Sequence, residues 1–233
     1  MNATKVILAG LLWIGVGEST SVAQATNEQF YTLISGSQLL DDCPICARPT
    51  IVVPMAGTFG LRVIDQNPLN TTYEVFGVSF HAGATPGPEY QVMGSGTYQT
   101  GGEVATGQDM YLDVTINNGY ASTEAQCVNT NRTVSQPWPG IQISLNQTNG
   151  TPGQVYYLTL VAIPIPKLRL FPPDSKGNVS LEWDANGGSF EVERAPSVTG
   201  PYSAVSPITT NSSFTDFGVM TNFPRVFYRL RQF

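Results

Sequence analysis

Strict alternation of apolar and polar residues runs through Asp109-Met110-Tyr111-Leu112-Asp113-Val114-Thr115-Ile116. Successive side chains of a β-strand point to opposite faces, so alternate positions share a face. The apolar residues of this stretch therefore line one face and the polar residues line the other, which is the pattern of a half-buried strand. The sequence Asn117-Asn118-Gly119 then predicts a turn.

Other short runs rich in β-branched and aromatic residues predict further strands. They are 30–34, 50–53, 58–64, 73–80, 90–98, 141–145 and 155–163. Gly, Pro, Asn and Asp punctuate the gaps between them, and no apolar stripe of helical period exceeds two turns after the first 25 residues. The glycines between 94 and 102 indicate a bulge or hairpin. We therefore expect an all-β fold, with a jelly-roll-like β-sandwich of roughly eight strands first in the chain.

Composition excludes several functional classes. The chain of 233 residues has a net charge of -6, only 12% charged residues and no run of Lys or Arg. Nucleic acid and anionic lipid surfaces are therefore not expected partners. With 41% hydrophobic and 10% aromatic residues, the chain can bury a substantial core, which argues against disorder.

The first 25 residues have the features of a secretory signal. Lys5 precedes an apolar run from Val6 to Val16, and Ala23-Gln24-Ala25 supplies the small residues of a cleavage site. We expect cleavage after Ala25, with Ala23 as the alternative. The apolar run is shorter than the roughly 20 residues of a membrane-spanning helix. The sequence therefore predicts a secreted protein of the extracellular space or cell surface, without a transmembrane segment in its mature form.

A change of composition marks a boundary between domains. Closely spaced prolines stiffen residues 164–174, which we interpret as a linker able to contribute an edge strand. The expected organisation is a signal peptide at 1–25, a β-sandwich at 26–163, the linker, and a second domain at 175–233.

The second domain carries a recognisable pattern. Its parts are Val179-Ser180-Leu181-Glu182-Trp183, Ser189-Phe190-Glu191-Val192-Glu193-Arg194-Ala195, Gly200-Pro201-Tyr202-Ser203, Phe214-Thr215-Asp216 and Val226-Phe227-Tyr228-Arg229-Leu230-Arg231. Together they resemble a fibronectin type III module, as found in secreted bacterial proteins, over about residues 167–233. The resemblance implies a small sandwich with a buried Trp183, serving as a spacer or docking unit.

The resemblance departs from the family at its last strand. That strand should follow the one containing Tyr228, but only five residues of the sequence follow Tyr228 itself. A sandwich without it exposes a sheet edge that another chain can fill by strand addition, unless the linker strand covers the gap.

Three cysteines are the main candidates for chemistry: Cys43, Cys46 and Cys127. In an oxidising compartment we favour a disulfide from Cys127 to Cys43 or Cys46. The alternatives are a tight bridge between Cys43 and Cys46, with Cys127 left to pair with another molecule, and a redox motif. The redox motif requires a helix after the first cysteine, whereas Pro49 and a β-branched run follow here.

Metal sites are weaker alternatives. The three cysteines with His81 make up a Cys₃His set, but only Cys43 and Cys46 have a zinc-knuckle spacing, so zinc is not expected. Oxygen ligands for calcium are available from Asp109, Asp113, Glu103 and the turn at 117–118, without a dense acidic loop. Asp109 and Asp113 lie about 13 Å apart along one strand, too far for a glycosidase pair. We expect no cofactor, with calcium as the one open option.

Trp138 is the remaining candidate for binding. It is held between Pro137 and Pro139 in an expected loop, where its ring can stack on a sugar, anchor a protein interface or fold back over the sandwich. The preferred function is a non-catalytic structural, adhesion or scaffold role, with other proteins or copies of itself as partners. The alternative is a carbohydrate-binding protein that uses Trp138 and has glycans as its partners.

Overall fold

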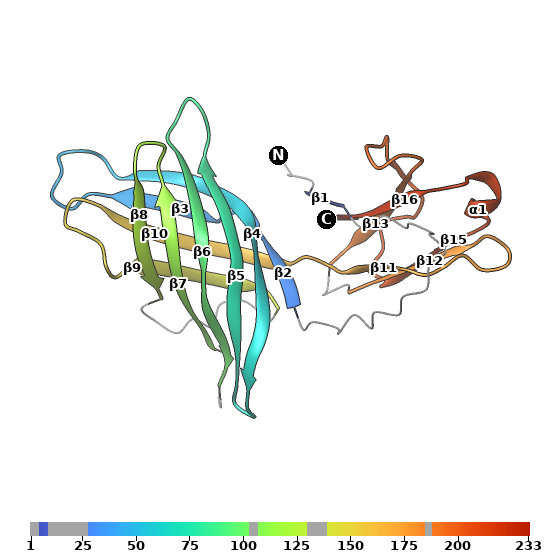
Figure 1. Cartoon of the computed structure of the whole chain (residues 1–233), viewed down its shortest axis with the longest axis horizontal. Coiled ribbons are helices and arrows are strands. Elements are labelled where there is room, and N and C mark those ends of the chain that lie inside the picture. The colour runs from blue at the N-terminus through green and yellow to red at the C-terminus, as the bar shows by residue number, and fades with distance from the viewer. Residues whose placement is uncertain (1–4, 9–27, 103–106, 130–138, 185–187) are drawn as a thin grey trace, which may run out of the picture. The chain divides into compact units, whose positions relative to one another are not determined.

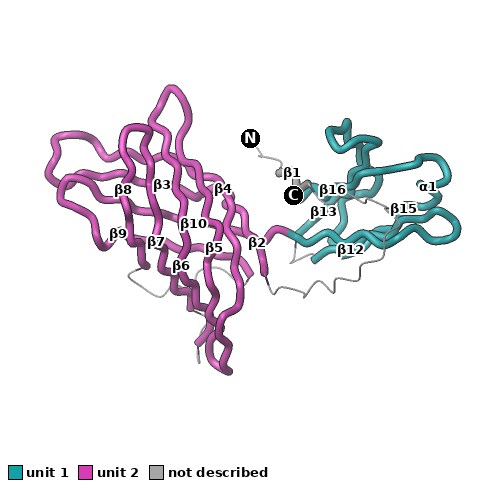
Figure 2. The backbone as a smooth tube through the Cα atoms, in the orientation of Figure 1, with its two compact units in different colours: residues 1–22, 166–233 teal, residues 23–165 magenta. Residues whose placement is uncertain are grey.

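The computed structural model describes residues 5–8 (backbone only), 28–102, 107–129, 139–184 and 188–233. The chain divides into two compact units, shown in Figures 1 and 2: unit 1 is Met1–Val22 with Pro166–Phe233, and unit 2 is Ala23–Ile165. The division after Ile165 falls inside the segment expected to be a linker.

Unit 2 is a sheet of nine antiparallel strands among the described residues. In chain order they are β2 Glu28–Leu33, β3 Gln38–Asp42, β4 Ile51–Gln66, β5 Asn70–Gly83, β6 Glu89–Gly101, β7 Gly107–Asn117, β8 Ser122–Val128, β9 Ile141–Gln147 and β10 Val155–Pro164. Each strand from β4 to β9 pairs with the next strand along the chain.

The sheet of unit 2 closes on itself. Strand β10 pairs with β9 on one side and with β2 and β3 on the other, and β2 and β3 both pair with β4. Strands β2 and β3 occupy successive positions along β4 and are separated by a bend. In that bend the Ser37 hydroxyl donates to the Val161 carbonyl and accepts from the Val161 N–H, both at 3.0 Å. Strand pairing is thus continuous around the closed sheet.

The closed sheet surrounds one apolar core. Burial alternates along β10, where every second residue from Tyr156 to Pro164 is buried, as expected for a strand with one face inward. Four fully buried tyrosines are the largest side chains of this core: Tyr31, Tyr90, Tyr98 and Tyr156. The interior of unit 2 is therefore filled by side chains from all its strands.

Two glycines allow β6 and β7 to approach closely. A Cβ atom placed on Gly94 would lie 2.1 Å from the carbonyl oxygen of Asp113, and one on Gly96 would lie 1.9 Å from that of Tyr111. No side chain fits at such distances. Both glycines lie inside β6, opposite a register irregularity of β5 between Val75 and Val78, and Gly101 ends β6 at the hairpin to β7. The predicted bulge or hairpin at these glycines therefore agrees with the structure.

Among its described residues, unit 1 contains two smaller sheets and one short helix. Its elements are β1 Lys5–Leu8, β11 Leu168–Leu170, β12 Val179–Trp183, β13 Phe190–Ala195, β14 Ser203–Ala204, β15 Ser213–Asp216, α1 Val219–Asn222 and β16 Phe227–Gln232. The sheets have the orders β1-β16-β13-β14 and β11-β12-β15. Their shared core holds Trp183, Phe190 and Tyr228. The Tyr228 hydroxyl donates to Asp216 Oδ2 at 2.9 Å, and Arg194 pairs with the same oxygen at 2.7 Å.

The all-β fold predicted from alternation is confirmed, and its large antiparallel sheets are consistent with a sandwich. In unit 2 the strands β3 and β8 were not predicted, and β1 lies within the expected signal, where no strand was predicted. Strand β11 lies in the segment expected to be a linker and pairs with β12. The described residues contain no helix with the length and apolar character needed to cross a membrane.

Candidate functional site: the loop end of unit 2

Four connections lie at the same end of unit 2, because neighbouring strands run in opposite directions. We call this the loop end and define it by the segments 43–50, 84–88, 118–121 and 148–154, which can be followed in Figure 1. Loops carried on a rigid sheet are common positions for binding residues. The loop end is therefore the main candidate for a binding site.

A disulfide closes the first of these loops. Cys43 and Cys46 are bonded, with their Cα atoms 5.2 Å apart, and the Cys46 N–H donates to the Cys43 carbonyl at 3.1 Å. The exposed Cys46 sulfur lies 3.8 Å from the Gly153 carbonyl oxygen of the neighbouring loop. The favoured pairing with Cys127 is therefore wrong. The chain enters β4 after this loop, so the helix that a thioredoxin-like redox motif requires does not follow it.

Cys127 lies on the inner face of β8 and is completely buried in the core. Burial raises the pKa of its thiol to about 12, and the negative charge of Asp113 adds to the rise. A thiol with this pKa and no exposure is a poor nucleophile. Covalent pairing of Cys127 with a second molecule is therefore not supported. Its side chain belongs to the inward-facing set of β8, so the thiol cannot reach another molecule.

A buried carboxylate lies beneath the disulfide loop. Asp41 Oδ2 accepts a 2.9 Å hydrogen bond from the Tyr90 hydroxyl, and Asp41 Oδ1 pairs with Arg48 Nη2 at 2.5 Å. Arg48 thus ties the far side of the loop back to β3. Burial, followed by the hydrogen bond to Asp41, raises the pKa of Tyr90. The charge on Asp41 is compensated within the protein, which is the condition for burying a carboxylate at low cost.

Tyr156 continues this polar layer across the closed sheet. Its ring meets that of Tyr90 edge to face, with centroids 6.3 Å apart. Gln154 Nε2 donates to the Tyr156 hydroxyl at 2.6 Å, and the Tyr156 N–H donates to Gln147 Oε1 at 3.0 Å. Burial raises the pKa of Tyr156 to about 12. The loops therefore rest on a packed and hydrogen-bonded layer.

Hydrogen bonds within the loops hold their shapes. Asn118 Oδ1 accepts from the N–H groups of Tyr120 and Ala121 at 3.0 and 2.9 Å. In the loop at 84–88, the N–H and hydroxyl of Thr85 donate to Glu89 Oε1 at 2.7 and 2.5 Å, and these bonds lower the pKa of Glu89. Such side-chain turns fix loop backbones without secondary structure.

Two large apolar side chains project from these braced loops. Tyr120, at the tip of the β7–β8 hairpin, is 99% exposed, and Ile45, inside the disulfide loop, is 74% exposed. Tyrosine offers a large contact area and loses little conformational entropy on binding, which makes it a common anchor of protein interfaces. The arrangement at the loop end suits contact with another macromolecule.

The fold does not bring together the four ligands of the possible zinc site. His81 is exposed on β5, whereas Cys127 points into the core and Cys43 is bonded to Cys46. Throughout the part of the chain that the structure describes, no group of three His, Cys, Asp or Glu side chains is placed to hold a metal ion.

Most of the oxygen atoms considered as calcium ligands accept hydrogen bonds within the protein or lie far along the strand. Asn117 Oδ1 and Asn118 Oδ1 accept backbone hydrogen bonds inside the β7–β8 turn, and Asp109 is bonded by Asn129 Nδ2 at 3.2 Å. Asp113 is exposed further along β7. Glu103, proposed as a ligand, and Trp138, proposed as a sugar platform, both lie outside the described residues.

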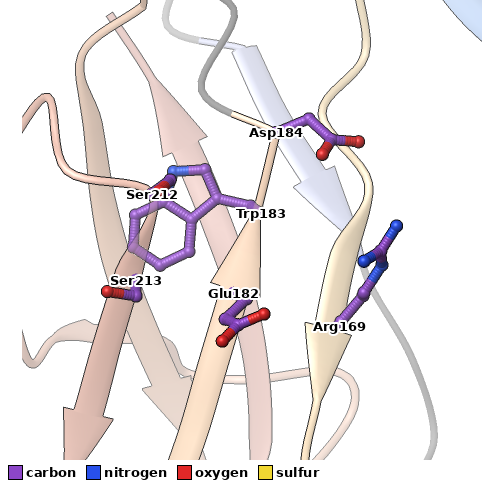
Figure 3. Close-up of a pocket in the computed structure, with 6 residues that line it drawn as sticks. All are labelled: Arg169, Glu182, Trp183, Asp184, Ser212 and Ser213. Atoms are coloured by element: carbon purple, nitrogen blue, oxygen red, sulfur yellow. The ribbon is translucent and has the colours of Figure 1, made fainter.

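Two shallow pockets lie away from the loop end. One of about 340 Å³ is formed by the β4–β5 hairpin at 66–71 with Tyr73, Thr100 and Gly101. The other, in unit 1, is about 310 Å³ and is shown in Figure 3. Its lining residues are Arg169, Glu182, Trp183, Asp184, Ser212 and Ser213. Trp183 is a core residue, packed against Phe190 with ring centroids 6.1 Å apart, so its ring is not available for stacking on a ligand.

Sequence reasoning missed the residues that distinguish the loop end: Tyr120, Ile45 and the pair Asp41 and Tyr90. The predicted turn at 117–119 located the hairpin but gave no reason to select the tyrosine after it. Comparison of the chain with protein-family profiles, with curated proteins and with solved structures found no match.

Proposed function

We propose that this chain is an exported, non-catalytic adhesion or scaffold protein of the cell surface or extracellular space, and that the loop end of unit 2 is its contact surface. One observation carries the proposal: Tyr120 and Ile45 are held in solvent by loops that a disulfide and side-chain hydrogen bonds brace. Exposed apolar side chains on preorganised loops bind with a low entropic cost.

Two further features support export and a non-catalytic role. The leader-like sequence at 1–25 agrees with a disulfide, because disulfides persist in oxidising compartments. The buried carboxylate at this end, Asp41, is engaged by Tyr90 and Arg48 and so is not free to act on a substrate. In unit 1, two sheets around a buried Trp183 support the proposed fibronectin type III-like module, which would act as a spacer or docking unit.

Adhesion of coated beads tests the contact surface. Beads carrying residues 26–233 are incubated with cells of the producing organism, and adhesion is compared with that of Tyr120→Ser and Ile45→Ser variants. Loss of an interface anchor lowers affinity by about tenfold or more. Ile64→Ser is the matched control, because Ile64 is 56% exposed on β4, thirteen positions beyond the start of that strand at the loop end.

Retained adhesion in both loop-end variants would contradict the assignment of the surface. A glycan array separates the alternative function: binding that disappears in Trp138→Ala and persists in Tyr120→Ser would favour the carbohydrate-binding protein. Export is tested by sequencing the amino terminus of the secreted protein, which should begin at Thr26.

A further inference from the structure

Both sides of β16 are paired with other strands. On one side, the six residues Phe227–Gln232 pair with β13, and on the other side four of them pair with Lys5–Leu8 of β1. Leu230 is in register with Val192 of β13 and with Ile7 of β1, so a row of three apolar positions crosses the sheet. The strand expected to be missing from unit 1 thus has its place taken by a segment of the leader.

The other face of this sheet carries compensated charges. Arg229 Nε pairs with Glu193 Oε2 at 2.5 Å, and Arg231 Nη1 lies 3.7 Å from Glu191 Oε2. Both acidic residues belong to β13, on the opposite side of β16 from β1. A strand added beside β16 therefore needs no acidic residues to balance the arginines, which agrees with the uncharged Val6 and Leu8 that stand in register with them.

We propose that the β1 side of β16 is a strand-acceptor site for an extended, largely aliphatic segment that lacks acidic residues. Lys5–Leu8 fills this site in the full chain, and removal of the leader opens it to a segment of the same chemistry in a partner protein. Addition of a strand to a sheet edge gives affinity through backbone hydrogen bonds and selectivity through alternate side chains. The inference rests on the proposed removal of the leader.

A second copy of the chain is a poor occupant if it uses β16 itself. Antiparallel pairing of two β16 strands must keep the faces of Leu230 matched, because a shift of one residue exchanges the faces. The registers that do so and pair five residues of each strand are centred on Arg229 or Leu230, and both place arginines of the two copies directly opposite one another. Like charges in directly opposed positions destabilise a strand pair.

Peptide binding tests the acceptor site. A fluorescent synthetic peptide of residues 3–10 is titrated into the chain of residues 26–233 and into the full chain. We expect binding to the shorter chain, and an affinity at least about tenfold weaker for the full chain, whose own segment occupies the site. The control peptide carries Ile7→Pro, which removes a backbone donor and should not bind.

Amide hydrogen exchange locates the binding. Residues 227–232 should exchange faster in the shorter chain than in the full chain, and the peptide should restore their protection. Equal binding to both chains, absence of binding, or self-association of the shorter chain with protection of β16 would each overturn the proposal. The bead assay of the loop end is independent of this result, so failure of one leaves the other intact.

Discussion

The hydroxyl of Tyr90 donates a 2.9 Å hydrogen bond to the buried carboxylate of Asp41, whereas the hydroxyl of Tyr31, equally buried, has no partner among the described residues. A hydrogen bond to a charged group contributes about 1.5–3 kcal/mol, and a buried polar group left without a partner costs free energy. We therefore expect Tyr90→Phe to lower the free energy of unfolding by about 2 kcal/mol. Tyr31→Phe should leave it unchanged or raise it. Urea denaturation of both variants measures the difference, and equal destabilisation would contradict this account of the core.

Alkaline pH should destabilise the protein well before its arginines or lysines titrate. Burial raises the pKa values of Cys127 and Tyr156 to about 12 and also raises those of Tyr31, Tyr90 and Tyr98. In the unfolded chain these groups ionise near pH 8.5 for cysteine and about 10 for tyrosine. The unfolded state therefore loses protons that the folded state keeps, and stability falls as pH rises.

The expected loss begins above about pH 8.5, with a slope that approaches 1.4 kcal/mol per pH unit for each group involved. Urea denaturation from pH 7 to 11 gives this slope. Cys127→Ala should reduce it between about pH 8.5 and 10, where cysteine is the first group to titrate. A free energy of unfolding that stays constant up to pH 11 would contradict the burial of these groups.

Native protein should show no reactive thiol. Cys127 is completely buried, and its raised pKa keeps it protonated at neutral pH. Treatment with a thiol reagent should label nothing until denaturant is added, after which one group per chain should react. Reduction should then reveal two more, from Cys43 and Cys46. A disulfide-linked dimer on a non-reducing gel, or labelling of Cys127 in the native state, would contradict the structure.

Reduction of the Cys43–Cys46 bond should destabilise the protein measurably without unfolding it. The bond closes a loop of four residues, for which loss of chain entropy predicts about 2 kcal/mol. The ion pair between Asp41 and Arg48 still ties the loop to β3 after reduction. Unfolding with and without reductant measures the cost, which should be the same in a Cys127→Ala background. Complete unfolding on reduction would show that the bond does more than close this loop.

Gly94→Ala should be strongly disruptive, because the added Cβ atom would lie 2.1 Å from the Asp113 carbonyl oxygen of β7. Overpacking of this kind costs about 1–3 kcal/mol, and separation of β6 from β7 would add to that cost. Gly153→Ala is the matched control, because the nearest atom to its added Cβ lies 4.0 Å away. The melting temperature measured by thermal unfolding should fall for Gly94→Ala only. Similar melting temperatures for the two would argue against close contact of β6 and β7.

The strands found by sequence reasoning are those with large apolar residues on one face. Strand β7 alternates Met110, Leu112, Val114 and Ile116 with polar residues, which is a direct signal of a half-buried strand. Strand β8 was not predicted because its inward residues are Ala125 and Cys127, whose small side chains give a weak apolar pattern. The runs predicted at 50–53 and 58–64 are parts of a single strand, β4. The sequence predicts two strands there because Pro54 and Gly57 usually interrupt a strand.

The candidate site was less predictable than the fold. Asp41 is an inward residue of β3, and a buried carboxylate breaks the apolar pattern that identifies a strand. Its burial is tolerable only because Tyr90, 49 residues away in sequence, and Arg48 both reach it. Exposure of Tyr120 is likewise set by the tertiary position of its hairpin. Local pattern does not contain these long-range relationships.

Closure of the sheet through β10 has a mechanical consequence for the proposed adhesion or scaffold role. Strand β10 starts next to the loop end and leads directly to the segment that joins unit 1. A pulling force applied at the loop end and resisted at that segment runs along the strand. Since β10 is hydrogen-bonded on both sides, to β9 and to β2 and β3, it must slide past two ladders at once before it is extracted. Such a load strains many perpendicular hydrogen bonds together and does not open them one by one.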